Sequence, residues 1–324
     1  MDFLYLLLGI AFAVYGAQLL VDGGVAIATR FGIPTLIIGS TVVAFGTSMP
    51  EFAVNIQSAL HGKTELALGN ILGSNLFNIA AIVGIVALIT PLAVSSQSRR
   101  KDFPMCLIAA LMVGIAGNQL YLDGVQYHQI MLSDGLVYML FLWIFMRYVY
   151  AEAAMATSNH EQAKTKSDPD HPVGGMGVTR AVVYILLGLT GLVLGGDFIV
   201  EGATGIARSF GLSERVIGLA IVGPGTSVPE LVASIVAALK KQVDMVLGNV
   251  LGSNILNIFF TLGVTALIEP VPLDLALNTV VLINIGITAA LVAYTRFSTR
   301  SIGRPVGVLL IVAYVAYLTA AIMA

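Results

Sequence analysis

Charge is scarce in this sequence. Only 10% of its 324 residues are charged, 57% are hydrophobic, and the mean hydropathy is +0.93. A soluble domain of this length carries far more polar surface, and no basic footprint of the kind that binds nucleic acid is present. The composition therefore predicts an integral membrane protein with membrane lipid as a partner, no nucleic acid, and no obligate protein partner.

Cysteine and histidine are equally rare. The single cysteine, Cys106, excludes an intramolecular disulfide, and the four histidines, His61, His128, His160 and His171, fall in predicted loops or at span ends. A serine protease within the membrane needs a base beside its nucleophile, and zinc or copper sites need imidazole or thiolate ligands. The ligand spacing of metalloproteases is missing as well. We therefore expect neither an enzyme nor a cofactor.

Strict alternation of polar and apolar residues is also missing, which argues against a transmembrane β-barrel. Apolar runs of about 20 residues, enough for a helix to cross about 30 Å of hydrocarbon, instead fill the chain almost end to end. They predict an all-α membrane protein with ten transmembrane helices, at 3–27, 34–60, 65–90, 103–118, 129–149, 178–204, 214–239, 243–268, 274–295 and 303–323.

Basic residues are unevenly divided between the predicted loops. Lysine and arginine accumulate on the cytoplasmic side of membrane proteins. If both termini lie outside, thirteen of the sixteen basic residues face the cytoplasm, and only Lys63, Arg208 and Arg215 face outward. We therefore expect both termini outside the membrane.

One unusual segment occurs twice. The sequence GTSMPE at 46–51 returns 179 positions later as GTSVPE at 225–230. With the same offset, 18 of the 40 residues at 39–78 are identical to those at 218–257. This identity indicates an internal duplication.

The duplication divides the chain into two halves, 1–150 and 178–324, joined by a polar segment at 151–177. We interpret that segment as a flexible cytoplasmic linker. Each half has five predicted spans, an odd number, so the two halves must enter the membrane from opposite sides. Inverted repeats of this kind place a site with broken helices near the midplane and expose it to either side in turn, which is typical of a carrier.

The repeated motif has the chemistry of a cation site. A carboxylate in the middle of an apolar span costs about 2.5–3.5 kcal/mol on insertion scales, so Glu51 and Glu230 need a compensating charge. Pro50 removes a helical hydrogen bond and distorts the preceding turn, which frees carbonyl oxygens as ligands. Thr47 lies four residues before Glu51 and presents its hydroxyl on the same face. The alternative is a pair of protonated carboxyls that are hydrogen-bonded for packing.

A second repeated motif adds oxygen donors to the next span. Its polar residues recur every fourth position and form one stripe on a helix: Asn70, Ser74 and Asn78, with Asn249, Ser253 and Asn257 in the second copy. Oxygen ligands alone suit calcium or an alkali cation. Interhelical hydrogen bonding is the competing explanation for these residues, with even weight for Asn70 and Asn249. Asn75 and Asn254 lie off the stripe and are interpreted as structural, while Asp22, Asp197 and Glu201 are interpreted as solvated boundary residues.

The paired GTSxPE and GNxLGSNxxN motifs resemble the α-repeats of the cation/calcium exchanger superfamily, specifically its prokaryotic sodium/calcium exchanger branch. The resemblance covers nearly the whole chain. It implies a sodium-driven calcium antiporter in a prokaryotic cell membrane, with sodium and calcium as the transported ions and both termini outside.

Position by position, the resemblance implies a set of ion ligands. Glu51 and Glu230 would be the central calcium ligands, assisted by the backbone carbonyls of Thr47 and Thr226. The flanking sodium sites would be lined by Ser48, Ser74, Ser227 and Ser253 together with the carbonyls of Ala44 and Gly223, and Asn78 and Asn257 would lie at the middle.

Two features depart from the family pattern. Several members have an aspartate where this chain has Asn257, so the site has one potential charge fewer, which leaves the stoichiometry and any role of protons or potassium open. The second repeat reads Gly223-Pro224-Gly225 where the first reads Ala44-Phe45-Gly46. The extra proline should deform the second helix further.

The function expected from the sequence is exchange of sodium for calcium by alternating access. A calcium/proton exchanger of the same fold is the nearest alternative, because the two glutamates can also titrate. An ion channel would need a continuous pore in place of an occluded midplane site, and inverted repeats with broken helices favour the carrier.

Overall fold

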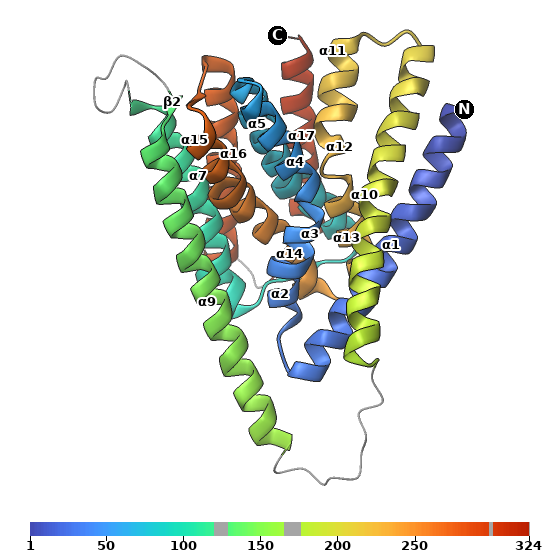
Figure 1. Cartoon of the computed structure of the whole chain (residues 1–324), viewed down its shortest axis with the longest axis vertical. Coiled ribbons are helices and arrows are strands. Elements are labelled where there is room, and N and C mark those ends of the chain that lie inside the picture. Colours follow the sequence, from blue (N-terminus) through green and yellow to red (C-terminus); the bar gives the residue numbers. More distant parts are fainter. Residues whose placement is uncertain (120–128, 165–175, 298–300, 324) are drawn as a thin grey trace.

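The computed structural model describes residues 1–119, 129–164, 176–297 and 301–323. Two long helices, α1 (Asp2–Phe31) and α10 (Val178–Ser209), pack side by side along one flank of the molecule (Figure 1). Small residues allow this close approach. A Cβ atom added to Gly16 would lie 2.8 Å from the carbonyl oxygen of Gly188, so the two backbones are in direct contact.

Two broken helices lie between this pair and the rest of the molecule. The first consists of α2 (Thr35–Ile38), the π-helix η1 (Gly39–Val43), α3 (Ala44–Thr47) and α4 (Met49–Leu60). The second consists of α11 (Glu214–Ile217), the π-helix η4 (Gly218–Val222), α12 (Gly223–Gly225) and α13 (Val228–Leu239).

The predicted helix breaks occur where the prolines stand. The first helix bends by 46° between Thr47 and Met49, and Pro50 occupies the first turn of α4, where its missing N–H costs nothing. In the second helix, α12 and α13 are separated by Thr226 and Ser227, and Pro229 occupies the first turn of α13. Each repeated motif therefore ends one helix and begins the next.

The centre of the molecule is formed by two further helical spans. One consists of α5 (Thr64–Leu76), η2 (Phe77–Ile82) and α6 (Val83–Ile89), and the other of α14 (Val243–Leu256), η5 (Asn257–Leu262) and α15 (Gly263–Ile268). Every residue of α14 from Met245 to Leu256 is buried. Gly248 and Gly252 bring α14 against the backbone of α2 and η1, so no space for a Cβ atom remains at either position.

The other described helices surround this centre. They are η3 (Ser98–Asp102), α7 (Phe103–Gly117), α9 (Leu132–Lys164), α16 (Leu275–Phe297) and α17 (Arg304–Met323). Two short antiparallel strand pairs connect loops of the two halves: β1 (Leu92–Ala93) pairs with β4 (Ser301–Ile302), and β2 (Gln129–Ile130) pairs with β3 (Val271–Pro272).

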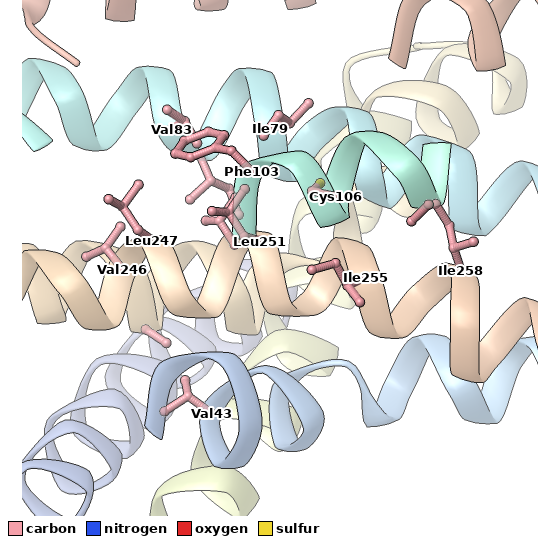
Figure 2. Close-up of a cluster of buried hydrophobic side chains, with 14 of the residues drawn as sticks. Val43, Ile79, Val83, Phe103, Cys106, Val246, Leu247, Leu251, Ile255 and Ile258 are labelled. Atoms are coloured by element: carbon pink, nitrogen blue, oxygen red, sulfur yellow. The ribbon is translucent and has the colours of Figure 1, made fainter. Parts of the chain in front are cut away.

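The apolar core lies between α14 and the helices that cover it. Cys106 is buried there. Large apolar side chains such as Leu7, Trp143 and Leu309 are instead exposed on the outside, as expected for a protein surrounded by lipid. Figure 2 shows part of the core, with side chains of α14 and η5 beside those of α7, η1 and the α5–α6 span: Val43, Ile79, Val83, Phe103, Cys106, Val246, Leu247, Leu251, Ile255 and Ile258.

The helix count differs from the ten predicted spans. Each predicted span coincides with helical structure, but among the described residues only seven helices are long and apolar enough to cross a membrane, or eight if the bent pair α2–α4 counts as one span. The helix α7 has only 15 residues, and the break at Thr226 and Ser227 divides the span at 214–239 into short pieces. The length criterion therefore fails where the chain uses short or interrupted helices.

The predicted linker is partly helical. Helix α9 continues to Lys164 instead of ending near residue 150, because the segment from Ala151 to Ala156 consists of Ala, Glu and Met, which are strong helix formers. Glu152 in this extension forms an ion pair with Lys101. Residues 165–175, with His171, and the loop residue His128 lie outside the described residues.

Candidate ion-binding site

Two fully buried carboxylates form the centre of the candidate site. Glu51 lies in the first turn of α4 and Glu230 in the first turn of α13, and neither is exposed to solvent. The helix dipole favours a negative charge at these N-terminal positions, which offsets part of the cost of burial. The helix breaks therefore place both acids where the backbone itself stabilises their charge.

The serines of each motif bind the carboxylate of the other motif. Ser227 Oγ donates to Glu51 Oε1 over 2.8 Å, and Ser48 Oγ donates to Glu230 Oε1 over 2.8 Å. Longer contacts of 3.4 Å join Ser74 Oγ to Glu51 Oε1 and Ser253 Oγ to Glu230 Oε1. Each carboxylate thus contacts hydroxyls from both halves of the chain, so the two motifs form one site.

Each threonine connects this site to the polar stripe of the next span in the other half. Thr226 Oγ1 lies 3.3 Å from Asn70 Oδ1, and Thr47 Oγ1 lies 3.3 Å from Asn249 Oδ1. Thr47 Oγ1 also lies 3.0 Å from the carbonyl oxygen of Val43, so its single proton has competing acceptors. The threonine hydroxyls are therefore engaged in hydrogen bonds.

Asn249 belongs to a structural network. Its Nδ2 donates to the Glu230 carbonyl oxygen over 3.3 Å and to Ser234 Oγ over 3.1 Å. In the other half, Asn55 Nδ2 donates to the Glu51 carbonyl oxygen over 2.7 Å. Asn55 and Ser234 stand at matched positions of the duplication and were not identified from the sequence; the 179-residue offset is the only signal that could have paired them.

Several buried oxygen atoms in this region have no hydrogen-bond partner. Among them are Glu51 Oε2, Glu230 Oε2, Asn78 Oδ1 and Asn257 Oδ1, and these four side chains are completely buried. Buried polar atoms are nearly always paired, because leaving one unpaired is costly. Two carboxylate and two amide oxygens without partners are what a hard cation would coordinate.

The described residues offer no alternative ligand set. No group of three or more His, Cys, Asp and Glu side chains comes together in residues 1–119, 129–164, 176–297 and 301–323. The candidate site is instead two carboxylates surrounded by hydroxyl and amide oxygens. This chemistry favours calcium or sodium over zinc or copper.

The two halves of the site differ in exposure. Ala44 is fully buried, and its carbonyl oxygen accepts the N–H of Ser48 over 3.0 Å, whereas the matched residue Gly223 is exposed. A cavity of about 470 Å³ lies beside Thr226, between α4, α10 and the second broken helix. Its lining includes Asp197 and Glu201, for which the sequence predicts a place at the boundary with solvent.

The sequence profile of the family described as "Sodium/calcium exchanger protein" matches residues 1–151 and 180–323, which is most of the chain. The chain belongs to this family. It is therefore a membrane transporter of the exchanger class, with the fold of an antiporter.

Similar proteins cover the chain from end to end. Inner membrane protein YrbG of Escherichia coli is 34% identical over 316 residues, which are 97% of this chain and 94% of YrbG. Sodium/calcium exchanger MaX1 of Methanosarcina acetivorans is 30% identical over 343 residues, covering 98% and 97%. The structure of the sodium-calcium exchanger NCX_Mj soaked with zero Na⁺ and Ca²⁺ superimposes with a TM-score of 0.82 at 28% identity, covering 98% of both chains.

Proposed function

We propose that this chain is a secondary antiporter that exchanges sodium for calcium by alternating access. The observation that carries the proposal is the pair of buried carboxylates, Glu51 and Glu230, each bonded through one oxygen to a serine of the other half and unpaired at the second oxygen. An ion that binds the unpaired oxygens touches both halves at once. Its binding can therefore be coupled to their relative arrangement.

Charge balance makes the binding of calcium and the binding of sodium mutually exclusive. Two ionised glutamates carry a charge of −2, which one calcium ion neutralises. Two or three sodium ions can do the same if the surrounding hydroxyl and amide oxygens supply further positions. Because both loads need the same carboxylate oxygens, they cannot be bound together, which is the minimal requirement for exchange.

The proposal assigns roles to the residues of the two motifs. Glu51 and Glu230 hold calcium together with the backbone carbonyls of Thr47 and Thr226. The flanking sodium positions use the hydroxyls of four serines, Ser48, Ser74, Ser227 and Ser253, and the backbone carbonyls of Ala44 and Gly223. The side-chain amides of Asn78 and Asn257 lie at the middle of the site.

We also propose that the chain has ten membrane-crossing segments arranged as two inverted five-helix repeats, 1–150 and 178–324, in a prokaryotic cell membrane with both termini outside. The matched positions of the helix breaks support the repeat. The π-helices η1 and η4 also begin 179 residues apart, at Gly39 and Gly218, as expected if both halves share one local structure.

Sodium is favoured over protons as the driving ion by the relatives. MaX1 and NCX_Mj are both named sodium–calcium exchangers, and each aligns with nearly the whole chain. Exchange of calcium for protons remains the alternative outcome of the experiment, since carboxylates can load protons in place of sodium.

Transport by the purified protein tests the proposal. Proteoliposomes loaded with sodium and diluted into sodium-free medium of the same pH should accumulate radioactive calcium, and no uptake should occur without the sodium gradient. Glu51→Gln and Glu230→Gln should abolish uptake, because each removes one of the two charges that balance calcium. Glu65→Gln is the matched control, since Glu65 is exposed at the start of α5.

Three results would contradict the proposal. Uptake that follows a pH gradient and ignores sodium would show a calcium/proton exchanger. Ion currents far above carrier turnover would show a channel. Normal uptake by both glutamine variants would remove the two carboxylates from the mechanism.

A further inference from the structure

A reciprocal pair of hydrogen bonds joins two asparagines at matched positions of the duplication. Asn75 Nδ2 donates to the carbonyl oxygen of Asn254 over 3.2 Å, and Asn254 Nδ2 donates to the carbonyl oxygen of Asn75 over 3.1 Å. Both side chains are buried, with 3% and 2% of their surface exposed. These two bonds are equivalent and join α5 to α14.

The equivalence ends at their side-chain oxygens. Asn75 Oδ1 accepts a hydrogen bond from Asn257 Nδ2 over 3.0 Å. The matched bond would run from Asn78 to Asn254 Oδ1, but Asn254 Oδ1 and both side-chain polar atoms of Asn78 have no partner. Both Asn75 and Asn254 line a small pocket of about 10 Å³ beside Cys106, so the pocket does not distinguish them. The two central amides are therefore held differently.

This difference matters because an amide has two unlike ends. Its oxygen attracts a cation, whereas its NH₂ group carries partial positive charge and repels one. The bond to Asn75 occupies the nitrogen of Asn257 and leaves Asn257 Oδ1 as the unpaired end. Rotation of this amide by half a turn would break that bond, place the oxygen of Asn257 against the oxygen of Asn75, and turn the NH₂ group to the unpaired side.

We propose that Asn75 is a positioning residue for the ion site: its hydrogen bond from Asn257 fixes that amide with the oxygen toward the transported cation. Asn78 has no such hydrogen bond. The proposal rests on the ion site described under the proposed function, in which Asn257 is a ligand. It also gives a use to asparagine at 257, since an ionised aspartate there could not donate to Asn75.

Ion binding to the purified protein tests this role independently of transport. The readout is the sodium or calcium concentration that gives half of the maximal thermal stabilisation. Asn75→Ala should raise this concentration about tenfold or more, the usual cost of losing a residue that orients a metal ligand. Asn254→Ala is the matched control, because it removes an equally buried amide and one of the two reciprocal bonds but leaves Asn257 held. Its half-maximal concentration should change by less than about twofold.

Two further variants separate positioning from a merely structural role. Asn75→Asp keeps an oxygen that can accept from Asn257, so ion affinity should stay at the wild-type value or increase. In a double-mutant cycle, Asn75→Ala should have no added effect on ion affinity once Asn257→Ala is present, because the residue it positions is gone.

The inference is overturned if Asn75→Ala and Asn254→Ala weaken ion binding equally, or if Asn75→Asp weakens it as much as Asn75→Ala does. It is also overturned if the loss of ion affinity in the Asn75→Ala, Asn257→Ala double variant is the product of the two single losses. Should Asn75→Ala not fold, the Asn75→Asp comparison decides alone. Failure of sodium-driven calcium uptake in the wild type would instead contradict the proposed function and leave the ion-binding comparison intact. Absence of any stabilisation of the wild type by sodium or calcium would overturn both.

Discussion

The charge of each buried glutamate is stabilised both by a serine hydroxyl and by the N-terminus of a helix. Glu51 and Glu230 each receive a short hydrogen bond of 2.8 Å from a serine and stand in the first turn of a 12-residue helix. Hydrogen bonds to an ionised acceptor are about twice as strong as those between neutral groups. These contacts occupy only one oxygen of each carboxylate, so the acids are partly stabilised while their second oxygens stay unpaired.

A third buried acid lies outside the membrane-spanning segments and makes a prediction about pH. Asp102 is 5% exposed; burial raises the pKa of its carboxyl, while hydrogen bonds from Tyr148 and Ser98 lower the pKa to a smaller extent. Its pKa in the folded protein is thus above its value in the unfolded chain. The folded state binds the extra proton between these two values, so the stability contributed by this group is lost as the pH rises through the raised pKa.

Asp102→Asn should therefore raise the melting temperature in detergent at neutral and alkaline pH, because it removes the cost of a buried charge and keeps an acceptor for Tyr148. The gain should shrink as the solution is acidified, since wild-type Asp102 is then neutral as well. Thermal unfolding followed across pH measures the difference, with Glu65→Gln as the exposed-carboxylate control. A gain that is the same at every pH would contradict the argument.

Residues whose chemistry repeats could be predicted from the sequence, and residues that act through a partner could not. Glu51 and Glu230 stand out because a charge beside a proline recurs in an apolar setting. Asn75 looks like its counterpart Asn254 in every local respect. Their difference arises only from the way Asn257 faces one of them in the folded molecule.

At the scale of elements, the duplication predicted the position of the helix breaks but not the shape of the helices around them. The break between Thr47 and Met49 follows from Pro50, which cannot continue a helical hydrogen-bond ladder. The π-helices η2 and η5 carry Asn78 and Asn257 into the core, yet a π-helix adds one residue to a turn without a characteristic composition. The amide positions therefore needed the structure.

The close packing of α1 against α10 depends on glycine. Replacing glycine by alanine should therefore lower the stability of the protein at this contact but not at an open site elsewhere. A Cβ atom at Gly188 would lie 2.6 Å from the backbone nitrogen of Leu20, whereas at Gly286 in α16 it would meet nothing within 4 Å. Gly188→Ala should destabilise the protein by about 1–3 kcal/mol through overpacking. Gly286→Ala should be neutral or stabilising, because alanine favours helix over glycine by about 1 kcal/mol.

Melting temperatures of the two alanine variants, purified in the same detergent, measure these effects. Because α1 and α10 lie beside both broken helices, Gly188→Ala should also reduce calcium uptake. Equal melting temperatures would show that the two helix backbones are not held as closely as described.

At the scale of the whole molecule, the chemistry is nearly symmetric but the exposure is not. Val43 and Val222 occupy matched positions in the π-helices η1 and η4, yet Val43 is 1% exposed and Val222 is 47% exposed. Val222 lines the cavity beside Thr226, while Thr47 is fully buried. The second π-helix thus borders a cavity, whereas the matched part of the first is covered.

Cysteine labelling tests this asymmetry. Val222→Cys in right-side-out vesicles should react with a membrane-impermeant maleimide much faster than Val43→Cys, since reaction requires an accessible thiol. The native Cys106 is 2% exposed and gives the background, measured in the unsubstituted protein. Equal rates at the two positions, or faster reaction at Val43→Cys, would contradict this difference in exposure.

The crossed serine contacts have a consequence for how such a molecule could be divided. Ser227 serves Glu51 and Ser48 serves Glu230, so each half supplies what the other lacks. A polypeptide ending after the first copy would hold Glu51 without the serine of its 2.8 Å hydrogen bond, and Ser48 without the carboxylate to which it donates. Such a half could complete both hydrogen bonds only by forming a dimer with a second copy. Covalent linkage of the two copies in one chain ensures that this pairing occurs.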